Sequence, residues 1–293
     1  MKTYLDCIPC LMHQALRAGR MATRAEHLLK RILDETGAMI KSLPLQSTPA
    51  ESGMLVYRKV RELTGVRDPY KAVKAAHIKE ARAIYPELIE IKNQSEDELR
   101  TAIRIAIAGN VIDLGINKPL ELVKDVRRTL AAEFAIFDYR AFKARLAEAK
   151  TILYLGDNAG ESVFDKILIQ ELKRKVVYAV RSAPIINDVT REDAMASGLA
   201  EVAELVDSGS AAPGTVLEMC TPDFRQRFDA ADLIISKGQG NYEALSDCHR
   251  QVFFLLKAKC VVVAEHLGVK MGDIVFKEHV PQSRRPQAEM GIS

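Results

Sequence analysis

The chain has 293 residues, 48% hydrophobic and 28% charged, a balance typical of one large or two ordinary globular domains in water. Its net charge of +3 is spread over interspersed lysines, arginines and acids, and tryptophan is absent, so we expect no nucleic-acid partner. No apolar run approaches the length that crosses a bilayer, so we expect no membrane partner either.

The chain begins with a Cys-x-x-Cys pair, Cys7 and Cys10. Such a pair is half a zinc site or a redox pair, and two idle thiols near a helix start are the alternative. His13 and Cys260 are the residues that would complete a cluster, although their spacing does not require it. The odd total of five cysteines argues against a disulfide framework, and the first ten residues are unlike a secretory leader. We therefore expect a cytoplasmic protein.

Helical spacing of apolar residues dominates the first half of the chain. Gly65 is expected to end one helix and Asp68 to cap the next, while Ser95 and Glu98 have the spacing of a capping box. The helices are predicted at about 26–40, 51–63, 69–84 and 99–112, with a further one from Pro119. We therefore predict a helical N-terminal domain over residues 1–148.

Short β-rich runs alternate with helical stretches after about residue 150. Strands are predicted at 152–155, 176–180, 202–206, 233–236 and 252–256, and helices at 161–173, 190–199, 222–230 and 241–248. This alternation indicates a parallel sheet covered on both faces. The predicted fold class is α/β, with a Rossmann-like domain over 149–277 that has a mainly parallel sheet. We expect a mobile tail over 278–293.

A carboxylate and a carboxamide, Asp157 and Asn158, follow the first of these strands. They stand where a strand passes into a helix, at the edge where open α/β sheets bind their ligands. Adjacent oxygen donors beside a helix start suit a hard divalent cation with an anion next to it. An ordinary helix N-cap is the alternative, because Asp and Asn are preferred caps.

Polar residues also follow the next strands. Asp188 comes after the second strand, the run Ser208-Gly209-Ser210 after the third, and Lys237 after the fourth. Parallel strands present their carboxyl ends to one side, so these residues should converge with Asp157 and Asn158. Two carboxylates and one amide can hold a single Mg²⁺ or Mn²⁺ ion and leave room for a phosphate oxygen. Backbone N–H groups at 208–210 and the Lys237 charge would suit the phosphate.

Each of these residues has a plainer interpretation. Asp188 could cap the helix that starts at Thr190, Asp207 could form a turn before its glycine, and Lys237 could be a solvated surface lysine. The residues alone favour a metal and phosphate site without deciding it.

The chain resembles the damage-control phosphatase family with the ARMT-like domain, formerly catalogued as domain-of-unknown-function family 89. The resemblance spans nearly the whole chain. It is carried by Cys7-Ile8-Pro9-Cys10, Asp68-Pro69-Tyr70, residues 106–115, Gly156-Asp157-Asn158-Ala159-Gly160-Glu161, Asn187-Asp188-Val189-Thr190 and Ser236-Lys237-Gly238-Gln239-Gly240-Asn241-Tyr242-Glu243. The Cys-x-x-Cys resembles the cysteine-bearing, largely prokaryotic branch. The resemblance implies metal-dependent hydrolysis of small phosphorylated metabolites.

Carried over motif by motif, the resemblance implies that Asp157, Asn158 and Asp188 ligate the metal and that Lys237 binds the phosphate. Glu161 occupies the acidic position after Asp-Asn-Ala-Gly, although some members have one more residue before their glutamate. The expected substrate-binding residues are Glu161, Ser208, Gly209, Ser210, Lys237, Asn241 and Asn110. Asn110 and Asp113 either face the site or brace the two domains. Cys7 and Cys10 are expected to form a second metal or redox site.

The sequence therefore predicts a phosphatase for small phosphate monoesters, such as sugar phosphates or damaged phospho-metabolites, with Mn, Ni, Co or Mg as cofactor. One rival is a carboxyl methyltransferase that uses S-adenosylmethionine, although the chain has no glycine-rich adenosyl loop followed by a ribose-binding acid. The other rival is a binding or redox module built on Cys7 and Cys10.

Overall fold

The computed structural model describes residues 1–109 and 126–281. Among these residues the helices are α1 (Cys7–Ala22), α2 (Glu26–Ile40), α3 (Pro49–Thr64), α4 (Lys71–Asn93), α5 (Glu98–Ala108), α7 (Tyr139–Glu148), α8 (Ser162–Leu172), α9 (Arg191–Ala196), α10 (Pro222–Ala230), α11 (Gly238–Leu245) and α12 (Val261–Leu267). The strands are β1 (Phe134–Phe137), β2 (Thr151–Leu155), β3 (Lys175–Val180), β4 (Glu204–Asp207), β5 (Leu233–Lys237), β6 (Val252–Lys257) and β7 (Ile274–His279).

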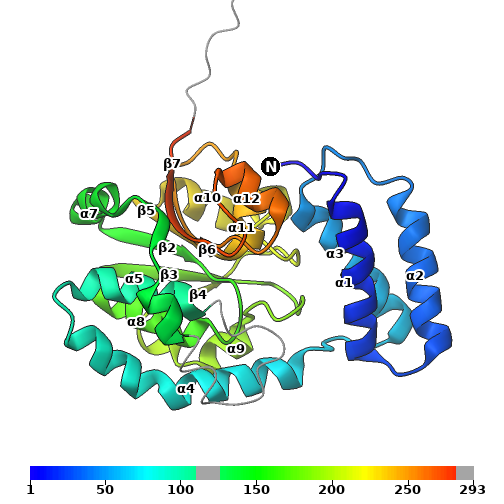
Figure 1. The fold of residues 1–293 in the computed structure, drawn as a ribbon, viewed down its shortest axis with the longest axis horizontal. Coiled ribbons are helices and arrows are strands. Elements are labelled where there is room, and N and C mark those ends of the chain that lie inside the picture. Colours follow the sequence, from blue (N-terminus) through cyan, green and yellow to red (C-terminus); the bar gives the residue numbers. More distant parts are fainter. Residues whose placement is uncertain (110–125, 282–293) are drawn as a thin grey trace, which may run out of the picture.

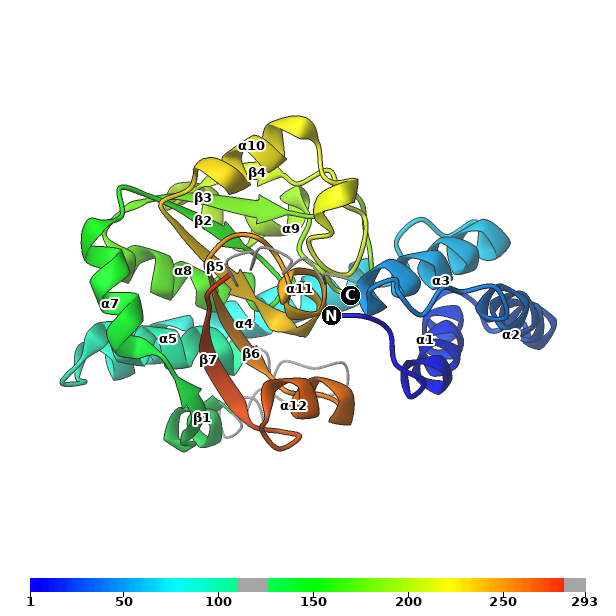
Figure 2. The same ribbon diagram turned by 90° about the horizontal axis from the view of Figure 1, so that it is seen from above.

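Helices α1, α2 and α3 form a separate lobe at one side of the sheet, as Figure 1 and Figure 2 show. Their apolar faces meet in a small core of their own, which includes Leu11, Ile32 and Val56. Helix α3 begins with a capping box between Thr48 and Glu51 and ends, as predicted, at Gly65, whose φ is 70°. We call helices α1–α3 the helical lobe.

The sheet has seven strands in the order β1-β7-β6-β5-β2-β3-β4. Strands β6, β5, β2, β3 and β4 run parallel, β7 is antiparallel to β6, and β1 is parallel to β7. The chain builds β2, β3 and β4 in one direction and then returns to place β5 and β6 on the other side of β2. Hence the strand order reverses between β2 and β5, which is where such sheets bind ligands.

Successive side chains along the strands point to opposite faces of the sheet and form two cores, one on each face. Ile152 and Tyr154 pack with α4, α5, α7 and α8 on one face, whereas Leu153 and Leu155 pack with α10, α11 and α12 on the other. The predicted fold class is confirmed: a helical N-terminal region precedes an α/β part with a mostly parallel sheet covered on both faces.

The five predicted strands are present, and the structure adds two. Residues 134–137, which the sequence analysis placed in the helical domain, form β1. Residues 274–279 form β7, which runs past the expected start of the tail at 278. The two added strands pair with each other, and β7 closes onto β6.

Two helix starts differ from the predictions. Helix α4 begins at Lys71 rather than at Asp68 and continues through Pro86, because Ile84 and Leu88 on either side of the proline belong to the core. Helix α5 is capped by Asp97, which accepts the N–H of Arg100, and not by Ser95. The helix start predicted at Pro119 lies outside the described residues, and residues 126–131 are helical. Within 1–109 and 126–281, no helix is both long and apolar enough to span a bilayer.

Candidate active site

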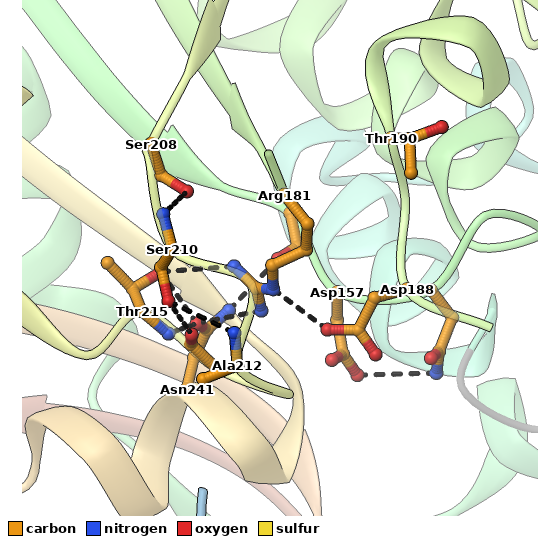
Figure 3. Close-up of polar contacts among 12 residues, drawn as sticks. Asp157, Arg181, Asp188, Thr190, Ser208, Ser210, Ala212, Thr215 and Asn241 are labelled. Carbon is orange, nitrogen blue, oxygen red and sulfur yellow. Dashed lines mark hydrogen bonds and ion pairs between the residues drawn. The ribbon is translucent and has the colours of Figure 1, made fainter. Parts of the chain in front are cut away.

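The loops after β2 and β3 bring the three predicted metal ligands together. Asn158 and Asp188 form an isolated antiparallel bridge, and the N–H of Val189 donates to the carbonyl of Asp157 at 2.8 Å. Figure 3 shows the Asp157 and Asp188 carboxylates next to each other. Asp157, Asn158 and Asp188 are only 7%, 9% and 3% exposed. Three residues from two loops therefore make one nearly buried group of oxygen donors.

Two glycines make room for this arrangement. A Cβ on Gly238 would lie 1.9 Å from Oδ2 of Asp157, and its φ of 79° is unfavourable for other residues. A Cβ on Gly156 would lie 2.5 Å from the hydroxyl of Tyr178. Gly238 therefore lets the end of β5 approach Asp157 closely, and Gly156 lets the end of β2 pack against Tyr178 of β3.

Lys237 is wholly buried beneath the site rather than at its surface. Its Nζ donates to Oε2 of Glu161 at 3.0 Å and to Oδ1 of Asp165 at 2.6 Å. Asp165 also accepts the hydroxyls of Tyr154 and Tyr178, at 2.7 and 2.9 Å. Burial lowers the pKa of Lys237, but Asp165 and Glu161 outweigh that effect and the net pKa is raised. The solvated-lysine interpretation is wrong, and direct contact with a phosphate stays a prediction.

Arg181, directly after β3, is the counter-charge of Asp188. Its Nε donates to Oδ2 of Asp188 at 2.8 Å, while its other nitrogens donate to Thr215 at 3.2 Å and to Asn241 at 3.1 Å (Figure 3). The guanidinium is only 1% exposed. Asp188 is not the cap of the following helix, because Thr190 itself is the N-cap of α9. A buried arginine instead holds Asp188 toward Asp157.

Asn241 braces this part of the site. Its Oδ1 accepts from Arg181 and Thr215, and its Nδ2 donates to the carbonyls of Gly156 and Lys237 at 3.0 and 2.8 Å. Both ends of the amide are therefore used within the protein, and Asn241 ties the ends of β2 and β5 to Arg181. Its predicted contact with substrate stays a prediction.

The loop after β4 is folded onto itself. The N–H of Gly209 donates to Asp207, the N–H of Ser210 to Oγ of Ser208, and the N–H of Ala212 to Oγ of Ser210. Ser208 and Ser210 are fully buried. Because side chains of the loop already accept these N–H groups, a phosphate would have to compete for them.

The site carries more buried negative than positive charge. The mutually contacting buried groups are four carboxylates and two cations: Asp157, Glu161, Asp165, Asp188, Arg181 and Lys237. Burial, followed by the charges of Glu161 and Asp188, raises the pKa of Asp157 well above its usual value. Burial also raises the pKa of Asp188 to about 6, although Arg181 opposes the shift. The excess of two negative charges matches one divalent cation.

Lys259, on the loop after β6, adds an exposed positive charge at the rim. Its charge lowers the pKa of Asp157, against the larger effect of burial. The backbone N–H of Lys259 donates to Oε1 of Gln239, at 2.8 Å, which fixes this loop beside the start of α11. Lys259 is therefore an exposed cation near Asp157, which the sequence analysis did not single out.

The helical lobe contacts the loop that carries Asp188. Ile186 packs against the core of the lobe and has a φ of 45°, which is unusual for a β-branched residue. Tyr57 of α3 lies nearby: burial raises its pKa, and the charges of Tyr70 and Asp188 add to the effect. The lobe therefore forms one wall beside Asp188.

The cysteine pair lies at the start of α1. Cys7 is half-buried and Cys10 is exposed, and all five cysteines are free thiols. Burial raises the pKa of Cys7, and the charges of Glu243, Cys10 and Cys260 raise it further. His13 instead bonds the carbonyl of Pro9. In the described part of the chain no three His, Cys, Asp or Glu side chains are arranged to hold a metal, so a metal or redox role for Cys7 and Cys10 stays a prediction.

Three charged site residues, Arg181, Lys259 and Asp165, were missed from the sequence, and two other residues cannot be placed. Arg181 and Lys259 each follow a buried strand, as Asp157 and Lys237 do, and that position was the available signal. The predicted residues Asn110 and Asp113 lie outside the described residues.

Three comparisons place the chain among known proteins. The family model of the damage-control phosphatase ARMT1-like domain matches residues 3–275. The chain is 34% identical to a damage-control phosphatase of Pyrococcus horikoshii over 94% of this chain and 97% of the relative, and 35% identical to one of Archaeoglobus fulgidus over 92% and 97%.

A solved structure agrees with these matches. The crystal structure of a DUF89 family protein from Pyrococcus horikoshii superimposes with a TM-score of 0.88 at 32% identity, over 95% of this chain and 99% of that one. The resemblance read from the motifs is thereby confirmed: the chain belongs to the damage-control phosphatase ARMT1-like family.

Proposed function

We propose that this protein is a divalent-metal-dependent phosphatase that hydrolyses small phosphate monoesters, such as sugar phosphates or damaged phospho-metabolites, in the cytoplasm. The family supports the phosphatase activity. The metal is supported by one observation above all, the excess of two buried negative charges around Asp157, Asn158 and Asp188. Carboxylate and amide oxygens are ligands for hard cations such as Mg²⁺ and Mn²⁺, and Co²⁺ and Ni²⁺ are the alternatives.

Two of the proposed ligands have an oxygen that the hydrogen bonds described above do not use. Asp188 uses Oδ2 for Arg181, which leaves Oδ1, and Asn158 uses Nδ2 for hydrogen bonds, which leaves its carbonyl oxygen. A bound dication would accept a phosphate oxygen and make the phosphorus more electrophilic. Lys259 would neutralise charge on the other phosphate oxygens from the rim. Asp157 or Asp188 would orient the attacking water, and the helical lobe would select the leaving group.

Phosphate release from a generic ester tests this proposal. The protein is stripped with a chelator and assayed with Mn²⁺, Ni²⁺, Co²⁺ or Mg²⁺. Asp157→Ala and Asp188→Ala are expected to lower the rate by about a thousand-fold, because several kcal/mol of metal-derived stabilisation are lost. Absence of release by the wild type with every ion would contradict the activity.

Asp232→Ala is the matched control. Asp232 is an exposed aspartate at the opposite edge of the sheet, where it accepts the N–H groups of Lys150 and Thr151. This variant is expected to keep its turnover. If Asp157→Ala also kept near-native turnover at saturating Mn²⁺, the ligand assignment would be wrong.

A further inference from the structure

The side-chain amide of Asn158 has only one favourable orientation. Its Nδ2 donates to Oε1 of Glu161 at 2.6 Å and more weakly to Oδ2 of Asp157 at 3.3 Å. Both partners are carboxylate oxygens, and the NH₂ group of the amide offers them its hydrogens. Turning the amide over would place Oδ1, which can only accept, against the same two oxygens. The carbonyl oxygen of Asn158 is therefore directed away from Glu161.

Glu161 is held in place by the residues behind it. Its second oxygen, Oε2, accepts from the buried ammonium of Lys237 at 3.0 Å. Lys237 is fixed in turn by Asp165, which the hydroxyls of Tyr154 and Tyr178 also hold. Every member of this network is at most 1% exposed. The network therefore presents a fixed acceptor to Asn158.

We propose that Glu161 is a positioning residue that sets the orientation of the Asn158 amide, so that the oxygen and not the nitrogen faces the divalent cation. Lys237 holds Glu161 in place. The NH₂ group of an amide is a donor and does not ligate a dication, whereas the amide oxygen does. This inference rests on the metal site of the proposed function and gives Glu161 a task other than the predicted substrate contact.

Glu161→Gln tests the proposal because the glutamine has one acceptor and one donor. The ammonium of Lys237 would attract the new carbonyl oxygen, and the new NH₂ group would then face Asn158. Asn158 is expected to turn its oxygen toward that NH₂ group and away from the ion. Calorimetric titration of the metal-free protein with Mn²⁺ is expected to show about 10- to 100-fold weaker binding, the usual effect of losing an outer partner of a metal ligand.

A second substitution distinguishes orientation from general damage. In Asn158→Asp combined with Glu161→Gln, the aspartate has oxygens on both sides and no orientation to lose. The pair also keeps the total charge of the wild type. Mn²⁺ affinity is expected to recover to within about tenfold of wild type. Failure of this double variant to bind better than Glu161→Gln would overturn the proposal.

Glu171→Gln is the matched control for charge. It makes the same substitution at the other end of α8, where Glu171 accepts from another buried lysine, Lys92, at 3.1 Å, and its effect on Mn²⁺ affinity is expected to be less than about threefold. Equal losses in Glu171→Gln and Glu161→Gln would show that the loss is not specific to Asn158, and near-native binding by Glu161→Gln would also refute the orientation role.

Folding of each variant is checked by circular dichroism before titration. If Glu161→Gln does not fold, Glu161→Asp replaces it, because it keeps a carboxylate for Lys237 but is one methylene shorter toward Asn158. About tenfold weaker binding is expected of it, and wild-type affinity would contradict the proposal. A wild-type protein that bound no Mn²⁺ would overturn the metal-dependent function itself, whereas normal wild-type binding with unaffected variants would overturn only the role of Glu161.

Discussion

Two buried lysines of this protein have nearly the same immediate partners. Lys74 in α4 is 2% exposed and bonds Asp68 at 2.9 Å and Asp193 at 2.8 Å. Lys237 at the end of β5 is fully buried and bonds Glu161 and Asp165. In both cases burial lowers the lysine pKa, and the two carboxylates outweigh it and raise the net value. Local chemistry alone would assign them the same role.

The difference lies in what the carboxylates do next. Asp68 accepts the N–H of Tyr70, and Asp193 completes the capping box of Thr190, so the Lys74 group fastens the start of α4 to α9. Oε1 of Glu161 instead accepts a hydrogen bond from Asn158, which belongs to the group of proposed metal ligands. The two ion pairs therefore differ in the other groups that their carboxylates bind. Those groups decide whether a buried ion pair belongs to the candidate site.

Replacing each of the two lysines by methionine should give the largest difference in turnover between two variants. Lys74→Met and Lys237→Met are both expected to lower the free energy of unfolding by about 3–5 kcal/mol, because each strands buried carboxylates. Only Lys237→Met is expected to lower metal-dependent turnover of the folded protein, by about 100-fold, since it also frees Glu161. Urea titration and phosphate release measure the two quantities. Equal losses of turnover in the two variants would contradict the different roles assigned to Lys74 and Lys237.

Asparagine substitutions should change stability in opposite directions. In the metal-free protein Asp157→Asn removes an excess negative charge and is expected to stabilise by about 1–2 kcal/mol. Asp193→Asn weakens a paired carboxylate and is expected to destabilise by about 1–3 kcal/mol. Thermal unfolding in chelator measures both variants. If Asp157→Asn also destabilised the metal-free protein, the charge excess would not be a source of strain.

The same excess should appear as a pH dependence of the metal-free protein. The pKa of Asp188 is about 6 in the fold, against about 4 in an unfolded chain. Between these values the folded state binds more protons, so this group makes the free energy of unfolding fall as pH rises from about 4 to 6. Subtracting the profile of Asp188→Asn from that of wild type isolates the effect. A difference that rises with pH in this window would contradict the assignment.

The smallest effect is expected at the cysteines. Cys7→Ser and Cys10→Ser together should change metal-dependent turnover by less than about twofold, because exposed or half-buried thiols outside the ligand group contribute little to it. Turnover is measured with the phosphatase assay at saturating Mn²⁺. A large loss would favour the rival in which the cysteines carry the main function.

The sequence predicted the parts of the fold that depend on local pattern. The five strands and the helices between them follow from apolar spacing, and Gly65 from the conformation it permits. Strand β1 was missed because it has only four residues, none of them fully buried, and it is held by β7, nearly 140 residues away. The local sequence pattern around β1 does not reveal a partner strand so distant in the chain.

The candidate site was likewise predictable only where it depends on local sequence pattern. The positions of Asp157, Asn158 and Asp188 follow from where their strands end. The burial of Lys237 does not, because its partners Glu161 and Asp165 lie 76 and 72 residues away on another element. A lysine after a strand looks the same from sequence whether it faces solvent or carboxylates.

Ile186 connects the helical lobe to the proposed metal site. This residue lies two positions before Asp188, and its side chain packs against the core of the lobe. A movement of the lobe would therefore displace the segment that carries the Asp188 carboxylate. Under the proposed function, we expect the binding of a metabolite at the lobe and the affinity for the ion to be thermodynamically coupled.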